Sequence, residues 1–88
     1  AEKLGMIYKV TPLDDFQTEI ETTAMTLAQM PTKALGMTKR LLNESMSNTL
    51  EQQLDLESKL QIEAAQSEDY AEGVTAFVEK RKPNFKGR

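Results

Sequence analysis

The sequence contains no cysteine, no histidine and no tryptophan among its 88 residues. Without cysteine the chain forms neither disulfides nor thiolate nucleophiles, and without histidine it has no imidazole base. The usual zinc sites, which are built from these two residue types, are excluded as well. We therefore expect no metal site in this chain, and nothing in the sequence reports on the redox compartment.

Long apolar runs are also missing, and we expect no leader segment. The longest apolar stretches are a handful of residues, far short of the roughly 20 that a membrane-spanning helix needs. The first residues, AEKLG, are unlike a signal peptide. We expect a cytoplasmic or matrix-like location and no membrane partner. A chain of 88 residues forms one small domain with a modest core, so a partner would stabilise it.

The inventory of catalytic groups is equally short. No glycine-rich phosphate loop and no GxSxG turn is present. General acid or base catalysis needs a carboxylate with a raised pKa, and Glu57 is the one mild candidate; the alternative is an exposed or salt-bridged helix residue. We assign no catalytic residue within the chain.

The remaining residues predict an all-α fold with about four helices after a short N-terminal extended segment. Capping signals mark the starts: Thr11 before Pro12, Thr49 with Gln52 as a capping box, and Ser67 before two acids. The expected helices run from Pro12 to about Gln29 or Met30, from Thr32 to Ser45, from Leu50 to about Gln66, and from Ser67 onward past Phe77.

Apolar residues at helical spacing predict which faces are buried. In the second helix we expect Leu42 to face inward, and the cost of Gly36 in a helix predicts a close backbone contact there. The third helix has apolar residues on more than one face, which predicts packing on two sides. Gly73, in the fourth helix, is either a packing contact or a weak spot.

The first ten residues have a different period. Leu4, Met6, Tyr8 and Val10 alternate with smaller or polar residues, as in a half-buried strand. No second strand pattern follows, and an unpaired strand needs a partner for its backbone groups. We expect this strand to pair with another chain or with missing sequence, or to stay loosely ordered. We therefore divide the chain into residues 1–10, a remnant strand at the end of a missing core, and residues 11–88, a helical region.

Charge is unevenly distributed along the chain. All 14 acidic residues lie in residues 1–79, whereas residues 80–88 carry five basic residues and no acid. Most of the surface would repel nucleic acid, so this cationic tail better suits a small anion such as a phosphate. The alternative interpretation is that a terminal run of lysine and arginine is simply solvated.

Phe77 and Lys80 give the tail its most specific signal. They are three residues apart, which would place them on one face of a helix. An aromatic ring beside an ammonium group can stack on a planar base while the charge binds a phosphate. This pair therefore predicts a nucleotide-bearing ligand.

The tail EGVTAFVEKRKPNFKGR resembles the C-terminal signature of the enoyl-CoA hydratase/isomerase (crotonase) family. LGMIYKV, MPTKALGMTKRLLN and TLEQQLDLESKLQ, leading into SEDYAEGV, recur in the family's order. LEQQLDLE and SEDYAEGVTAF look closest to the branch that isomerises epoxyphenylacetyl-CoA in phenylacetate breakdown, although related hydratases share this pattern. The resemblance covers nearly the whole chain.

The resemblance implies that this chain is the C-terminal helical trimerisation region of a crotonase-like fold. The catalytic carboxylates and oxyanion-hole N–H groups would lie upstream of Ala1. The chain alone would then be inactive, whereas the parent protein would be an active enzyme. Trimers of the family commonly stack into hexamers. No cofactor is bound tightly, and coenzyme A is part of the acyl-CoA substrate. By position, Phe77 matches the phenylalanine near the adenine and Lys80 the lysine near the 3′-phosphate. Arg81 and Lys82 match the basic run and receive only a general electrostatic role.

Two other functions stay open on the sequence alone. A stand-alone acyl-CoA-binding helical module would be a compact monomer that needs no upstream domain. A pure oligomerisation module would associate with itself regardless of CoA, and replacing Phe77 and Lys80 would leave it unchanged.

Overall fold

The computed structural model describes residues 1–88 as an all-helical chain without strands. The elements are the 3₁₀ turns η1 (Glu2–Leu4) and η2 (Leu13–Asp15), followed by the α-helices α1 (Phe16–Ala28), α2 (Thr32–Ser45), α3 (Leu50–Ala65) and α4 (Glu68–Val78). The prediction of an all-α chain with four helices is confirmed, and the bounds of α2 are those expected.

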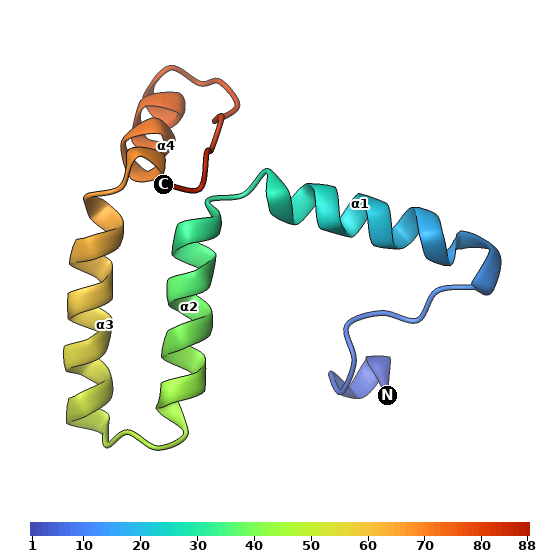
Figure 1. Ribbon diagram of the computed structural model, residues 1–88, viewed down its shortest axis with the longest axis horizontal. Helices are drawn as coiled ribbons and strands as arrows, with labels where there is room; N and C mark the ends of the chain where they lie inside the picture. Colours follow the sequence, from blue (N-terminus) through green and yellow to red (C-terminus); the bar gives the residue numbers. More distant parts are fainter.

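The helices α2 and α3 form an antiparallel pair that organises the rest of the chain (Figure 1). The helix α4 packs against the end of α3, and the last residues fold back beside α4. On the other side of the pair, α1 extends sideways, with the N-terminal segment beyond it. The chain is therefore a hairpin of two helices, and α4 with the C-terminal residues lies at one end of it.

Local hydrogen bonds fix the starts of α3 and α4. The Thr49 hydroxyl accepts from the Gln52 N–H (3.2 Å), and the Gln52 amide oxygen accepts from the Thr49 N–H (2.9 Å). The Ser67 hydroxyl accepts from the Tyr70 N–H at 3.1 Å. These bonds satisfy backbone donors that have no partner within the helix, so the predicted capping box and serine cap are both confirmed.

The strand predicted for the first ten residues is wrong. The turn η1 closes with Gly5 in the left-handed conformation (φ 70°), and the apolar side chains beyond it stay exposed, Tyr8 at 83%. Alternation yields a strand only where a neighbouring strand pairs its backbone groups, and none does so here. An ion pair between Lys9 and Glu19 (2.7 Å) ties this segment to α1 instead. The division of the chain after residue 10 stays a prediction.

The start of α1 also differs from the expectation. The turn η2 precedes it, with Pro12 as the capping residue and no side-chain capping bond, so the Thr11 hydroxyl is not a cap. Pro12 has an extended backbone (φ −54°, ψ 148°), which places it before the turn rather than in the first helical position. The end of the helix is as expected, with Gln29 as the C-terminal cap.

The chain is much more open than a globular domain of its size. Its radius of gyration is 16.5 Å, against about 12 Å for a compact chain of this length. It exposes 7448 Å², whereas a globular protein of this mass exposes about 5,200 Å². Only Leu60, Ala76 and Asp69 are buried. The apolar faces of the helices are therefore largely uncovered.

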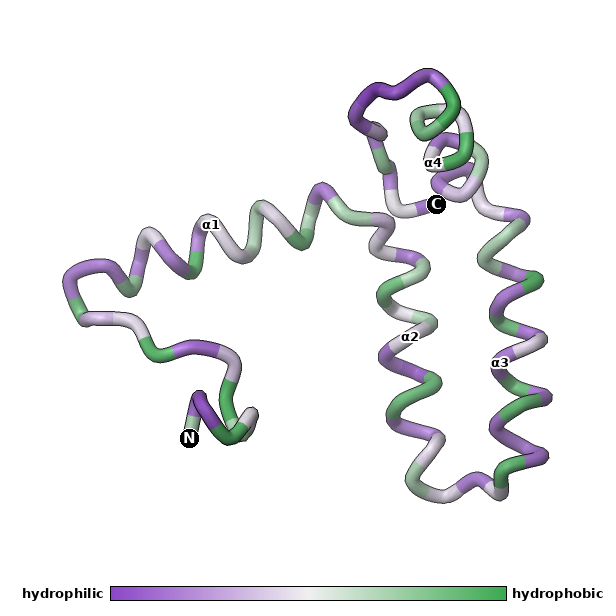
Figure 2. The backbone as a smooth tube through the Cα atoms, turned by 180° about the vertical axis from the view of Figure 1, so that it is seen from behind, coloured by the Kyte–Doolittle hydropathy of each residue, from purple (hydrophilic) through white to green (hydrophobic).

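Two predictions about buried faces are wrong for this reason. Leu42, expected inward, is 66% exposed, and a Cβ at Gly36 would have nothing outside its own helix within 4 Å. On α3 one apolar face is packed, with Leu60 at 3% exposure, while Ile62 on another face is exposed. Figure 2 shows hydrophobic residues recurring along the projecting α1.

None of the helices combines the length and the apolar content that crossing a bilayer requires.

Candidate functional site

The C-terminal segment, residues 79–88, folds back along α4 and is held there by Asp69. The carboxylate of Asp69 accepts from the Lys86 N–H (2.6 Å) and from the Gly87 N–H (2.8 Å). Its own N–H donates to the Arg88 carbonyl (2.9 Å). Asp69 is 4% exposed and lies in the first turn of α4, where the helix dipole favours a negative charge. The sequence indicated only this dipole effect and missed the contact with the tail.

Glu72, almost one helical turn further along, makes a second attachment. Its carboxylate accepts from both terminal nitrogens of Arg81 (2.6 and 2.9 Å) and from the Asn84 N–H (2.8 Å). Arg81 also donates from Nε to Glu79 at 2.6 Å. The hydrogen bonds from Arg81 and then from Asn84 lower the pKa of Glu72 to about 2, and the pKa of Arg81 is raised in turn by its bonds to Glu72 and Glu79.

Before these attachments, directly after α4, the backbone makes a tight left-handed turn at Lys80. The helix ends at Val78, and Lys80 has φ 54°, a conformation usually reserved for glycine. The Lys80 N–H donates to the Phe77 carbonyl (3.2 Å) and the Arg81 N–H to the Ala76 carbonyl (3.0 Å). This pair of bonds is a Schellman motif, which closes the C-terminus of a helix.

The prediction that Phe77 and Lys80 share a helical face is therefore wrong. Phe77 lies in the last turn of α4 and is 85% exposed, whereas Lys80 lies in the turn after the helix. The two residues still meet at one end of α4, because a backbone hydrogen bond joins them. Helical spacing failed here because it assumes that the helix continues.

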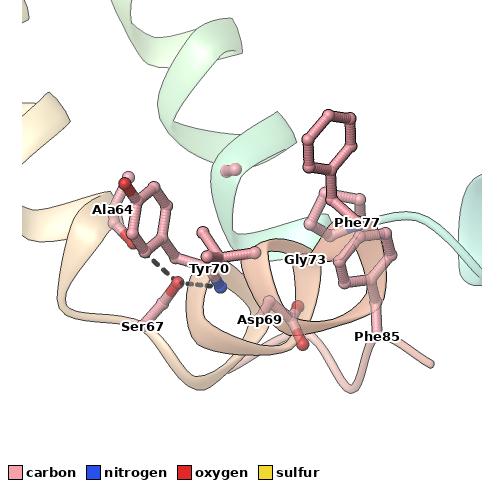
Figure 3. Close-up of a pocket in the computed structure, with 10 residues that line it drawn as sticks. Ala64, Ser67, Asp69, Tyr70, Gly73, Phe77 and Phe85 are labelled. Atoms are coloured by element: carbon pink, nitrogen blue, oxygen red, sulfur yellow. Dashed lines mark hydrogen bonds between the residues drawn. The ribbon is translucent and has the colours of Figure 1, made fainter. Parts of the chain in front are cut away.

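An apolar groove of about 400 Å³ lies beside this turn. Figure 3 shows the groove at the junction of α4 with α2 and α3, with the rings of Phe77 and Phe85 near Gly73. A Cβ on Gly73 would lie 3.5 Å from the Phe85 ring, so Gly73 is a packing contact for the tail, as one of the two alternatives proposed. The lining residues are Pro31, Ala34, Ala64, Ser67, Asp69, Tyr70, Gly73, Val74, Phe77 and Phe85.

The tail carries less free positive charge than its sequence indicated. Arg81 is paired with Glu72 and Glu79, and Arg88 with Glu68 at 2.9 Å. Lys80, Lys82 and Lys86 form no ion pair in this structure, so the cations available to an external anion are these three lysines. The other carboxylate singled out from the sequence, Glu57, is exposed on α3.

Comparison with known proteins identifies the family. The model of the enoyl-CoA hydratase/isomerase family matches residues 1–88, which is the whole chain. The chain belongs to this family. The resemblance found in its C-terminal signature is thereby confirmed.

Curated relatives and solved structures agree with this assignment. A probable enoyl-CoA hydratase of Rhodobacter capsulatus and the 1,2-epoxyphenylacetyl-CoA isomerase of Escherichia coli are each 42% identical over 88 residues, covering 100% of this chain and 34% of the relative. The crystal structure of an enoyl-CoA hydratase from Polaromonas sp. JS666 matches with a TM-score of 0.88 and 34% identity, covering 97% of this chain and 33% of that one. The chain thus spans about a third of the length of these family members.

Proposed function

We propose that residues 1–88 form the helical part of an acyl-CoA hydratase or isomerase, in which they join subunits and supply one edge of the CoA site. The family match over the whole chain supports this assignment. Equal identity to a probable hydratase and to an isomerase supports both reactions alike. We place the protein in the cytoplasm and CoA in the substrate rather than in a tightly bound cofactor.

The chemistry itself is proposed to come from groups outside these residues. An acyl-CoA hydratase or isomerase of this kind would stabilise an enolate of the thioester with backbone N–H donors and move protons with carboxylates. The carboxylates of Asp69 and Glu72 already accept hydrogen bonds from the tail and are not available to move protons. Residues 1–88 alone are therefore expected to be inactive.

Within the chain, Phe77 and Lys80 are the proposed ligand contacts. One observation carries this proposal: the exposed Phe77 accepts a backbone hydrogen bond from Lys80, and the Lys80 ammonium has no acidic partner. The ring is suited to stack on the adenine of CoA, and the ammonium to bind the 3′-phosphate. Arg81 is excluded from direct phosphate binding because its guanidinium is shared by Glu72 and Glu79.

The test compares CoA esters with their 3′-dephospho analogues in the complete protein. Lys80→Ala is expected to weaken the CoA ester about tenfold, which corresponds to roughly 1.4 kcal/mol, and to leave the dephospho analogue within about twofold. Lys82→Ala is the matched control, because it removes the same charge two residues away. Equal weakening of both ligands in Lys80→Ala would remove Lys80 from this role.

Phe77 predicts a different pattern, because both ligands contain adenine. Phe77→Ala should weaken the CoA ester and the dephospho analogue equally, by the roughly 1–3 kcal/mol typical of base stacking on an aromatic side chain. A pantetheine thioester, which lacks the nucleotide, should bind unchanged. A loss of pantetheine binding would show that Phe77 acts on the groove rather than on the base.

Subunit association is the second part of the proposal, and the openness of the chain supports it. The surface in excess of a globular protein of this mass is about 2,200 Å², and we propose that neighbouring subunits cover part of it while the rest of the parent chain covers the remainder. We propose a homo-oligomer, a trimer or a hexamer. Analytical ultracentrifugation showing a monomer over a wide concentration range would contradict it.

The two alternatives are separated by the same experiments. A stand-alone acyl-CoA-binding module would need a compact monomer, and the low burial of this chain disfavours it. A pure oligomerisation module would associate with itself regardless of CoA, so replacing Phe77 and Lys80 would change neither its assembly nor the affinity of the complete protein for CoA esters. That second result, combined with normal assembly, would favour the oligomerisation module over our proposal.

A further inference from the structure

The left-handed turn at Lys80 is a strained feature that other contacts must maintain. A residue with a Cβ in this conformation costs about 1–2 kcal/mol. Such conformations persist where surrounding contacts over-determine them, and they cluster at functional sites. Lys80 lacks the conformational freedom of glycine, so contacts of the neighbouring residues must hold it in this conformation.

The restraint converges on the carboxylate of Glu72. Arg81, the residue after Lys80, is bound to Glu72 through both terminal nitrogens, and the Asn84 N–H binds Glu72 as well. A two-pronged contact of this kind fixes orientation as well as distance. Arg81 also donates to Glu79, so the residues on both sides of Lys80 are tied together. The backbone of the turn is thus held from the flank of α4.

We propose that Glu72 is the positioning residue of the turn at Lys80, and that it thereby sets how strongly the protein prefers a ligand bearing a phosphate monoester. This inference rests on the proposed phosphate contact of Lys80. Glu72 itself does not contact the ligand. It fixes the direction in which the ammonium group leaves the turn.

Simple electrostatics predicts the opposite effect of replacing Glu72. Glu72→Gln removes a negative charge near the ligand phosphate and releases the guanidinium of Arg81, so charge alone predicts tighter binding. If positioning dominates, the turn relaxes and the preference for the phosphate falls. The sign of the change therefore decides between the two effects.

The experiment measures the ratio of dissociation constants for the dephospho analogue and the CoA ester in the complete protein. We expect Glu72→Gln to lower this ratio at least threefold. Glu68→Gln is the matched control: it makes the same change of charge one turn earlier on α4, where the Arg88–Glu68 pair is exposed. Its ratio should stay within about twofold of the parent value. A ratio that is unchanged or raised in Glu72→Gln would overturn the proposal.

A second variant tests the positioning role without changing the net charge. Arg81→Lys retains the positive charge but cannot make the two-pronged bond, so it too should lower the ratio. Combining Glu72→Gln with Lys80→Ala should lower the ratio no further than Lys80→Ala alone, because the two residues act on one contact. Independent, additive losses would contradict positioning.

Failure of this inference and failure of the proposed function give different results. If Lys80→Ala lowers the ratio and both Glu72→Gln and Arg81→Lys leave it unchanged, only the positioning role is lost. If Lys80→Ala itself leaves the ratio unchanged, the phosphate contact is wrong and the role of Glu72 falls with it.

Discussion

Replacing Lys80 with glycine should strengthen the turn after α4 while removing its side chain. The left-handed conformation at Lys80 (φ 54°) costs a residue with a Cβ about 1–2 kcal/mol, and glycine avoids this cost. Glycine also gains freedom in the unfolded chain, which takes back about 0.4–1 kcal/mol. The net expected gain is therefore about 1 kcal/mol in the free energy of opening the turn.

Hydrogen–deuterium exchange of peptides covering the turn measures this quantity directly, because it reports local opening. The Arg81 N–H, bonded to the Ala76 carbonyl at 3.0 Å, should exchange about fivefold more slowly in Lys80→Gly, as 1 kcal/mol implies. Lys80→Ala is the control: it removes the same charge but keeps the Cβ, so its exchange should stay within about twofold of the parent.

Ligand binding should move the opposite way from stability. Lys80→Gly lacks the ammonium group, so its preference for the 3′-phosphate should fall as far as that of Lys80→Ala, although its turn is more stable. Exchange in Lys80→Gly that is as fast as in Lys80→Ala would refute the reasoning, because it would mean that the conformation at Lys80 is not strained.

Three further outcomes are expected. The Glu72 carboxylate, whose pKa is lowered to about 2, stabilises the folded tail fully above its ordinary pKa near 4.5, and this contribution should disappear as the pH falls from 4.5 to about 2. The NMR chemical shift of the Asn84 amide should follow this titration. A midpoint near 4.5 would contradict the contact. Thr49→Ala should lower the free energy of unfolding by about 1 kcal/mol in denaturant titrations, while Thr11→Ala, which removes no cap, should change it by less than about 0.5 kcal/mol. Asp69→Asn retains one acceptor oxygen for the two N–H donors of residues 86 and 87. It should lower the free energy of unfolding by about 1–3 kcal/mol and speed hydrogen exchange of these two amides. Exchange as slow as in the parent would exclude Asp69 as the residue that holds the tail.

Local signals allowed the starts of α3 and α4 and the end of α1 to be predicted from the sequence. The capping box at Thr49 and the cap at Ser67 involve residues within three positions of each other, so their geometry follows from the chain itself. Pro31 likewise separates α1 from α2 because it restricts its own backbone and that of the preceding residue. The family signature in the tail added what no local rule supplies, the expectation of a CoA ligand.

Contacts between distant residues could not be predicted in this way. Asp69 binds backbone groups 17 and 18 residues away, and nothing in the composition around Asp69 indicates its partners. The conformation of Lys80 was equally hidden, because glycine is the usual signal for a left-handed helix end. The paired arginines of the tail are a further case, since a run of bases does not show which acids fold against it.

The buried faces were misjudged for another reason. A hydrophobic period indicates that a face is covered but does not identify the covering surface. Leu42 has the spacing of a core residue yet is exposed in this chain, and the alternating residues near the N-terminus found no strand to pair with. Neither pattern is satisfied by contacts within residues 1–88.

The sideways position of α1 has a consequence for how its sequence can change over evolution. Its apolar residues Phe16, Ile20 and Leu27 remain about half exposed, and the helix extends away from the α2–α3 pair (Figure 1). Substitutions at these positions should therefore be compensated by mutations in whatever surface covers them, and not within the hairpin. Covariation in aligned homologues would then connect α1 to residues beyond this chain, whereas α2 and α3 would vary together.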